Sequence, residues 1–496
     1  MTTLVPPPTR PNTRSRAGAW IDLGLSLLAL IFIAWLFQWT NRSIGGFQAP
    51  GPEDYYNFQV QGWLKGHLHL SVEPSEAMRA LKDPYDPAQN GPVRLADASY
   101  YEGHYYLYFG SAPAFVLLFP YALLTGKALG STIAVYLFGC VGVGAAGILW
   151  LSLRRRYYPD SAIGIGALGI LFLGCGTHLL TLQRRPFFWE LSIVSAFAFS
   201  MLAFLCLYWA LHGRRPVLAM LLGGLFFGLT IASRPTYLVG AVAILPVLWH
   251  LRREPATAVS WKRAAVAAFG AIGVCVLAML VHNVARFDHP LEFGLNYQLT
   301  SSYESKMKHF SWSYLPQNLR IYFLHPADWS AHFPFVKMTG LRGGPPGYLS
   351  EWNESICGLF VSLPMTLLLL ACPFLPPKNA TGPGLRVLVT SLGIYFLIMG
   401  TLISALLVAT SRYMIDFTPA LALLAAIGWL NVERWASGLR AGFAIKFALI
   451  LLCLVTVVAG IAISFNYHDD WWKNAIPLEW AKTERFFAKF GLGAAR

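Results

Sequence analysis

Twelve apolar runs follow one another along this chain, and they limit its fold more than any other feature. Most are about as long as the 20 residues that a helix needs to cross the hydrocarbon core of a bilayer. Only 12% of the residues are charged, about half the share of a typical soluble protein. The sequence therefore predicts an all-α fold, a polytopic transmembrane helical bundle of about 11–12 spans. The runs lie at 20–39, 107–126, 130–151, 161–182, 190–211, 217–232, 236–251, 264–283, 356–375, 385–409, 412–431 and 442–465.

The excess of basic residues does not indicate a nucleic-acid partner. The formal net charge is +14, but the lysines and arginines stand in short clusters between apolar runs, as the positive-inside rule predicts for a membrane protein. The seven cysteines lie mostly within the apolar runs and include no Cys-x-x-Cys pair. We therefore expect neither a disulfide framework nor a zinc site formed by cysteines.

The basic clusters also orient the chain in the membrane. The arginines near the start of the chain predict a cytoplasmic N-terminus, and Arg154–Arg156 should lie on the same side. This holds if residues 107–151 make one net crossing, with 107–126 partly re-entrant or interfacial. The alternative is a further crossing elsewhere in the chain. Two long polar stretches, 40–106 and 284–355, then lie on the outer side.

The same pattern predicts the division of the chain into parts. A large outer loop with juxtamembrane helices is expected directly after the first span. The parts are a cytoplasmic disordered tail (1–18), an N-terminal transmembrane module (19–283) that includes the outer loop 40–106, a second outer loop (284–355), C-terminal transmembrane helices (356–465) and a C-terminal interfacial segment (466–496).

Four arginines break the positive-inside trend, because this topology places them on the outer side. They are Arg184 and Arg185 in LQRRPFFWE, Arg234 in IASRPTY and Arg412 in ATSRYMIDFTPA. An arginine close to the hydrocarbon is costly unless it reaches the interface or finds a partner. For any single one, an ion pair within the bundle is as good an interpretation as a functional role. Four on one face favour a functional site.

The stretch GPEDYYNFQVQGWLKGHLHL, residues 51–70, predicts a short helix on the membrane surface, with apolar residues at helical spacing. Pro52 suits the first helical position. Glu53 and Asp54 then fall in the first turn, where the helix dipole stabilises ionised carboxylates. Neighbouring side chains on a helix point in different directions, so one carboxylate could be catalytic and the other structural. The alternative is that both only cap the helix.

Further candidates lie in RLADASYYEGHYYLYFGSAPAF, where Asp97, Glu102 and His104 stand among tyrosines. Carboxylate and imidazole groups could bind a divalent metal, although no tight ligand spacing is present. An interfacial belt of tyrosines is the other interpretation, and its rings could also stack on a sugar. Metal dependence therefore stays open at this point.

Glu190 follows Arg184 and Arg185 closely in RRPFFWE. It could pair with one of these arginines, or it could help to hold an acceptor or a metal. Tyr55 and Tyr413, which directly follow Asp54 and Arg412, complete the candidates for the acceptor or metal site.

The order of these features resembles the GT-C superfamily of membrane glycosyltransferases, especially its protein mannosyltransferase-like and aminoarabinose transferase-like branch. PEDYYNFQVQGWLKGHL is similar to the family's acidic opening after the first helix, with Asp54 as the better match to the acidic residue and Glu53 as the alternative. RRPFFWE loosely matches the second acidic site, hence Glu190. SRPTYLVGAVAILPVL and SRYMIDFTPALALLAAIGWL are similar to a Thr/Ser-Arg/Lys-Pro segment and a late Arg-Tyr helix. The likeness covers roughly residues 20–250 and 385–431, and the usual His-Pro-Pro and Arg-x-Asp motifs are replaced.

The resemblance implies transfer of a hexosyl or pentosyl group from a polyprenyl-phosphate-linked donor to an acceptor at the outer face. The reaction would invert the anomeric centre, with Asp54, or else Glu53, as general base. It also implies a multi-pass protein among membrane lipids, by default in a bacterial inner membrane with a periplasmic active site. A divalent metal is the one cofactor considered. The donor phosphate would be bound by Arg412, Arg234, Arg184 and Arg185.

Two functions of other classes compete with this one. A transporter or flippase for lipid-linked sugars would need charged groups along a path through the bilayer, and the central runs contain few of them. A non-catalytic subunit that binds a lipid-linked glycan would share every feature above except turnover.

Overall fold

The computed structural model describes residues 16–42, 54–213, 215–253, 260–374, 383–466 and 471–493. Glu53 and residues 1–15 of the predicted tail lie outside these ranges. The regular structure of the described residues is almost entirely helical, because a helix satisfies its own backbone hydrogen bonds where no water is available. The prediction of an all-α, multi-pass membrane bundle is confirmed.

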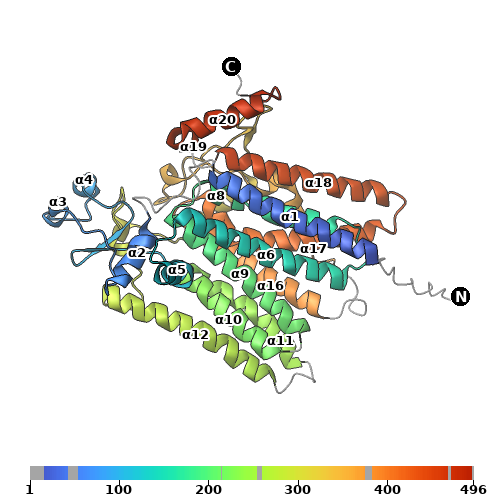
Figure 1. Ribbon diagram of the computed structural model, residues 1–496, viewed down its shortest axis with the longest axis horizontal. Helices are drawn as coiled ribbons and strands as arrows, with labels where there is room; N and C mark the ends of the chain where they lie inside the picture. Colours follow the sequence, from blue (N-terminus) through green and yellow to red (C-terminus); the bar gives the residue numbers. More distant parts are fainter. Residues whose placement is uncertain are drawn as a thin grey trace.

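Within the described residues, eight segments are long and apolar enough to cross a membrane. Figure 1 shows them running roughly alongside one another. Of the most apolar stretch of α9, 94% is buried, against 11% for α12, so α9 forms the centre of the bundle and α12 its edge. The segments are α1 (Arg16–Arg42), α6 (Ser131–Tyr157), α9 (Phe188–His212), α10 (Pro216–Ser233), the 3-10 helix η2 (Pro235–Ile244) with α11 (Leu245–Arg253), α12 (Ser260–Phe287), α16 (Gly384–Ser404) and α18 (Gly442–Ile463).

Three further segments connect the same two ends of the bundle. They are α7 (Ile165–Cys175) with α8 (Leu179–Arg184), α14 (Leu359–Ser362) with the 3-10 helix η9 (Pro364–Ala371), and α17 (Thr418–Ala436). Polar residues on α17 find partners inside the protein: Asn431 accepts a hydrogen bond from Tyr158, and Glu433 accepts one from the backbone N–H of Ala162. Among the described residues, eight segments thus have the length and composition of membrane spans, and these three shorter or more polar segments bring the number of passes toward the predicted 11–12.

Contacts at both ends of α6 establish its direction relative to α1. Arg154, at the end of α6, lies 2.7 Å from Asp22 near the start of α1, whereas Ser131, at the start of α6, contacts Asp54 beyond the end of α1. The two helices are therefore antiparallel, and residues 107–151 make one net crossing. The π-helical turn η1 (Ala114–Leu118) and helix α5 (Phe119–Thr125) precede α6, and Figure 1 views α5 nearly along its axis, so α5 lies across the long helices.

The buried pair of Asp22 and Arg154 gives a stability prediction. Asp22→Ala leaves the Arg154 guanidinium buried without its carboxylate, and we expect the free energy of unfolding to fall by about 3–5 kcal/mol. Thermal unfolding of the purified protein in detergent measures the change. Arg155→Ala, which removes an exposed neighbour on the same helix, is the control and should have little effect. Equal stability of Asp22→Ala and the wild type would contradict the prediction.

We call the end of the bundle at Asp54 the loop end, because both long loops emerge there. The predicted helix of the first loop is shorter than 51–70: Asp54 is its N-cap residue rather than part of its first turn, and it stops at Leu64. Gly66 follows with a φ of 86°, the left-handed conformation that ends helices. The elements of this loop are α2 (Tyr55–Leu64), α3 (Glu76–Arg79), α4 (Pro87–Asn90), and the antiparallel strands β1 (Ser99–Tyr101) and β2 (His104–Tyr106).

The second loop packs against the first and against the chain after α16. The backbone N–H of Leu299 donates to Ala98, and that of Asp97 donates to Leu299. The backbone N–H of Glu354 donates to Ala409. This layer places loop residues over the helix ends. Its elements are η4 (Leu295–Tyr297), η5 (Glu304–Lys306), η6 (Trp312–Tyr314), α13 (Leu315–Leu319), η7 (Arg320–Leu324), β3 (Asp328–Trp329) paired with β4 (Val336–Lys337), η8 (Ser350–Trp352) and η10 (Ser411–Asp416).

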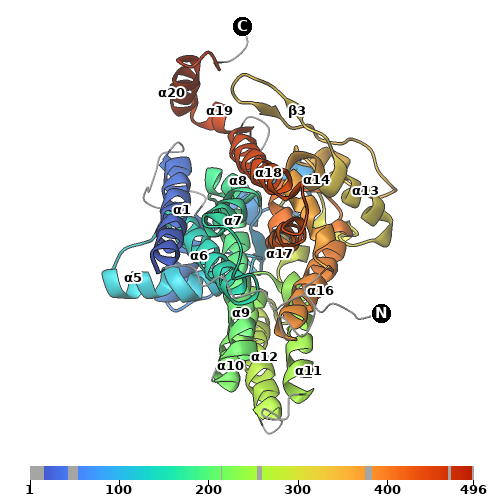
Figure 2. The ribbon, with the colours of Figure 1, turned by 90° about the vertical axis from the view of Figure 1, so that its right-hand side faces the viewer.

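The chain after α18 returns to the loop end and packs there through aromatic rings. It forms η11 (Ser464–Asn466), α19 (Trp471–Ala475) and α20 (Pro477–Ala488). The ring of Phe333, in the β3–β4 hairpin, lies 4.7 Å from Trp480 and 5.5 Å from Phe487. Figure 2 shows α19 and α20 beside this hairpin, above the end of α18.

Candidate functional site

Arginines and carboxylates from four separate segments meet at the loop end. Nε of Arg412 lies 3.2 Å from a carboxylate oxygen of Glu354, and its Nη1 lies 3.8 Å from Oε1 of Glu190. Nη1 of Arg185 lies 4.0 Å from the same Glu190 oxygen. Both glutamates are buried. Together with Arg234 and Asp416, described next, these residues are called the arginine cluster.

The 3-10 helix η10 carries both Arg412 and Asp416, and its Asp416 binds the third arginine of the cluster, Arg234. Its Nη2 lies 3.1 Å from Oδ2 of Asp416, and Tyr237 donates a hydrogen bond of 2.8 Å to the other oxygen. Burial raises the pKa of Asp416, while the charge of Arg234 and the bond from Tyr237 lower it. The Arg234 guanidinium also lies 5.0 Å from the centre of the Tyr413 ring. A single short helix thus positions two of the arginines.

Glu354 holds the start of η10 in place. Its Oε2 accepts hydrogen bonds from the backbone N–H of Ser411 at 3.0 Å and from the Ser411 hydroxyl at 2.9 Å, and its other oxygen faces Arg412. Glu354 is not among the site residues predicted from the sequence. The sequence nevertheless contains a signal for it. Glu354 stands just before the apolar run 356–375, in the same way that Glu190 stands at the start of the run 190–211.

Trp189, in the first turn of α9, presents its ring to two arginines of the cluster, Arg185 and Arg412. Its ring centre is 4.7 Å from Cζ of Arg185 and 5.5 Å from Cζ of Arg412, distances at which a ring face attracts a cation. Its neighbour Phe188 stacks on Tyr55 at 4.2 Å. The Tyr55 hydroxyl donates to the carbonyl of Ala96, so Tyr55 links the start of α2 to the segment that carries Asp97.

Asp54 directly precedes Tyr55 and is almost fully buried, and among the described contacts its carboxylate bonds to Ser131 rather than to a member of the arginine cluster. Its Oδ2 accepts the backbone N–H of Ser131 at 3.0 Å, and its Oδ1 accepts the Ser131 hydroxyl at 2.7 Å. The carboxylate therefore caps the start of α6 instead of α2. Burial raises the pKa of Asp54, and the hydrogen bonds from Ser131 and Asn57 partly oppose this.

Asp97 faces the arginine cluster from the first loop. Its φ is 59°, a left-handed conformation that aspartate tolerates better than most residues. Burial raises the pKa of Asp97, and the charges of Arg412, Arg94 and Arg185 lower it. Its side chain otherwise contacts Gln298 at 3.4 Å. The structure thus adds a carboxylate beside the two arginines that surround Glu190.

Three of the predicted site residues lie elsewhere. The guanidinium of Arg184 lies over the ring of Trp472, 4.0 Å from its centre, and donates to the carbonyl of Ser464. Glu102 is exposed in the turn between β1 and β2, and His104 lies on β2 beside His69. Arg185, Arg234, Arg412, Glu190, Asp97 and Tyr413 do come together. Tyr55 reaches them through Phe188, and Asp54 precedes Tyr55 in the chain.

The arginine cluster as it stands does not fit a metal site. Among the described histidines, cysteines and acids, no three from the cluster bring their ligand atoms close together, and Glu190, Glu354 and Asp416 each face an arginine. The arrangement fits an anion better. Within the described chain, Nε and Nη1 of Arg185 make no hydrogen bond and remain available as donors.

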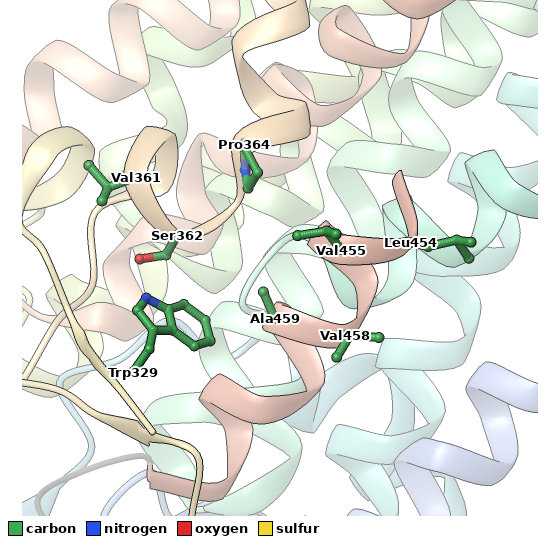
Figure 3. A pocket seen from close by; sticks show the side chains of 8 residues that line it. All are labelled: Trp329, Val361, Ser362, Pro364, Leu454, Val455, Val458 and Ala459. Carbon is green, nitrogen blue, oxygen red and sulfur yellow. The ribbon is translucent and has the colours of Figure 1, made fainter. Parts of the chain in front are cut away.

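An apolar pocket of about 440 Å³ opens between α18 and the segment that follows Glu354 (Figure 3). Trp329, Val361 and Pro364 line one side, and Val455 and Val458 of α18 line the other. Val458 precedes Ser464, at the loop end of α18, by about two helical turns. The pocket therefore lies a short way below the loop end.

Comparisons with known proteins support the fold. No protein-family model matches the sequence, and no curated protein matches it by sequence. The oligosaccharyltransferase AglB from Archaeoglobus fulgidus, solved with an inhibitory peptide and a dolichol-phosphate, is similar with a TM-score of 0.51 and 13% identity over 97% of this chain and 60% of that one. ArnT from Cupriavidus metallidurans, solved with undecaprenyl phosphate, gives a TM-score of 0.45 and 13% identity over 96% and 80%. The chain therefore has a fold similar to that of the AglB oligosaccharyltransferase.

Proposed function

We propose that the protein is an inverting membrane glycosyltransferase that uses a polyprenyl-phosphate-linked sugar as donor. The arginine cluster at the loop end carries this proposal, because it places guanidinium groups where the headgroup of a membrane lipid would lie. The proposed setting is a bacterial inner membrane, with the loop end on the periplasmic side. AglB, which has a similar fold, was solved with a dolichol-phosphate, and this agrees with a donor of this class.

In this proposal Arg185, Arg412 and Arg234 bind the donor phosphate. A guanidinium presents parallel N–H groups that match two phosphate oxygens. The contacts of Glu190 to Arg185 and Arg412 are long, at 4.0 and 3.8 Å, so a phosphate competes with them at little cost. The isoprenoid chain would lie against the apolar side of the bundle, and the pocket of Figure 3 offers walls for part of it.

Asp54 is the proposed general base. As the acceptor hydroxyl attacks the anomeric carbon from the side opposite the phosphate, Asp54 takes the hydroxyl proton. The bond from the anomeric carbon to the phosphate oxygen breaks, and its electron pair leaves with polyprenyl phosphate, whose added negative charge the arginines stabilise. The new glycosidic bond has inverted configuration. Asp97, which lies beside Arg412 and Arg185, would orient the acceptor.

Undecaprenyl phosphate tests the proposal before the sugar is identified. In lipid nanodiscs the thermal midpoint of the protein should rise with the concentration of undecaprenyl phosphate, because a ligand of the native state stabilises it. Phosphatidic acid, which carries a phosphate on different chains, should give a smaller rise. No specific rise would contradict the proposal.

A turnover assay distinguishes a glycosyltransferase from the two competing functions, the non-catalytic subunit and the flippase. Release of undecaprenyl phosphate from a panel of undecaprenyl-phosphate sugars, in the presence of cell-envelope acceptors, is expected from an enzyme. Binding without release from any donor would favour the non-catalytic subunit. Movement of the intact donor across a vesicle bilayer would favour the flippase.

The buried position of Asp54 also predicts how the reaction depends on pH. A general base works only when ionised, and burial raises the pKa of Asp54. We therefore expect kcat/KM to fall on the acid side already above the ordinary aspartate pKa of about 3.9. A profile of kcat/KM against pH measures this, and Asp97→Asn is the control. The acid limb should keep its position in that variant, and a limb that moves would assign it to Asp97.

A further inference from the structure

Two histidines and a glutamate converge at the far end of the first loop, away from the arginine cluster. His69 follows α2, Glu73 precedes α3, and His104 lies on β2. One ligand atom of each side chain lies within 4.8 Å of the ligand atoms of the other two. Among the described residues this is the only group of three such side chains close enough to share a metal ion.

The fold of the loop brings these residues together from two separate segments. The backbone N–H of Leu70 donates to the carbonyl of Tyr105 at 2.8 Å, which places their neighbours His69 and His104 side by side. The two imidazole rings lie 4.1 Å apart and nearly parallel, at 18°. His67 stacks on the other face of His69 at 3.6 Å and 6°. Backbone pairing and ring stacking therefore bring these side chains together without any ion, and the two imidazoles need only turn about χ2 for their lone pairs to meet at one ion.

Hydrogen bonds leave the imidazole of His69 ready to act as a ligand. Its Nδ1 lies 3.0 Å from the carbonyl oxygen of Leu70. A carbonyl oxygen only accepts, so in the neutral ring Nδ1 carries the proton and Nε2 is the nitrogen with a lone pair for a metal. Histidines that bind metals commonly donate their other ring N–H in this way. Nδ1 of His104 is enclosed and, within the described residues, has no hydrogen-bond partner.

Glu73 supplies the carboxylate of the group. Glu73 is exposed, and its Oε2 lies 2.6 Å from Arg79. The other carboxylate oxygen remains for an ion, while Arg79 orients the group.

We propose that His69, Glu73 and His104 bind one divalent transition-metal ion, with zinc as the expected ion. Two imidazoles and one carboxylate form a known set of zinc ligands and leave a fourth position for water. Imidazole ligands also suit copper and nickel but not magnesium or calcium. The ion would join the end of α2 to the β1–β2 hairpin, and so fix the described part of the first loop, which starts at Asp54 and contains Asp97. This site is independent of the proposed transfer reaction.

Metal analysis of the full-length protein in detergent tests the site directly. After treatment with EDTA and dialysis against zinc, mass spectrometry should find about one more zinc ion per chain in the wild type than in a His69→Ala/His104→Ala variant. The thermal midpoint of the wild type should rise with zinc concentration, and that of the variant should not. In the wild type, cobalt should give the strong visible absorption of a four-coordinate site.

Two single variants sharpen the result. Glu73→Gln keeps the size of the side chain and removes its charge, and it should weaken zinc binding about tenfold or more. His289→Ala removes an exposed histidine of the second loop and should leave zinc binding unchanged. Absence of stoichiometric zinc in the wild type, or equal zinc in the double variant, would overturn the proposal. Because the readout is bound metal, this result does not depend on whether the protein transfers sugar.

Discussion

The Asp54→Asn variant is expected to lose transfer by about 10²–10⁴-fold, the usual contribution of a general base. Asparagine cannot take a proton from the acceptor, but its carbonyl oxygen still accepts a hydrogen bond from Ser131. The loss of the second bond should cost only about 1 kcal/mol of stability. Single-turnover release of undecaprenyl phosphate measures the rate, and thermal unfolding in detergent measures the stability.

Ser131→Ala is the matched control, because Asp54 and Ser131 form one capping contact between α2 and α6. This variant breaks the hydroxyl bond to Oδ1 of Asp54 and keeps the carboxylate. If Asp54 is the base, Ser131→Ala should retain transfer although both variants lose stability. If Asp54 only caps α6, the two variants should behave alike. Loss of transfer in Asp97→Asn together with retention in Asp54→Asn would assign the base to Asp97.

The Arg412→Lys variant should lower kcat/KM for the donor by about 10²–10³-fold, as removal of a donor to a developing oxyanion does. Lysine keeps the positive charge between Glu190 and Glu354, so neither carboxylate is left without a cation. It lacks the planar fork that can contact Glu354 and two phosphate oxygens together. Affinity for undecaprenyl phosphate should fall as well, which can be measured without knowledge of the sugar.

Arg184→Lys provides the comparison, since Arg184 is also buried but faces Trp472 rather than the arginine cluster. Its substitution should change thermal stability, through the weaker contact with the ring, and leave donor affinity intact. Equal loss of affinity in the two variants would show that the effect is general to buried arginines. Full affinity and rate in Arg412→Lys would remove Arg412 from the proposed phosphate site.

Much of the architecture follows from local properties of the sequence. Apolar runs of spanning length predict the helices, because a backbone in lipid must satisfy its own hydrogen bonds. The cluster at Arg154–Arg156 predicts one net crossing over residues 107–151, and the pair of Arg154 with Asp22 shows why: both residues lie at the same end of the bundle. Asn431 and Glu433 make the end of α17 more polar than a typical membrane span. Their partners, Tyr158 and Ala162, lie on a distant part of the chain and cannot be identified from the sequence of α17 alone.

Some residues of the site can likewise be predicted from the sequence, and others cannot. An arginine or acid at the end of an apolar run is visible in one stretch of sequence, and this rule selected Arg185, Arg234, Arg412 and Glu190. It could not tell Arg185 from Arg184, which are neighbours in sequence but lie among different partners, Glu190 and Trp472. Glu354 and Asp416 acquire their roles only from contacts with residues distant in the chain.

The stretch around Asp54 also shows how far prediction from sequence reaches. From the sequence alone, Asp54 belongs to the start of a surface helix and carries a charge beside the membrane. In the folded chain its side chain turns from α2 to the first residue of α6, and its neighbour Tyr55 stacks on Phe188. Hydrophobic periodicity and charge act over a few residues and therefore appear in the sequence. The partner of a buried polar group is chosen by packing between distant segments, and only the tertiary structure contains that information.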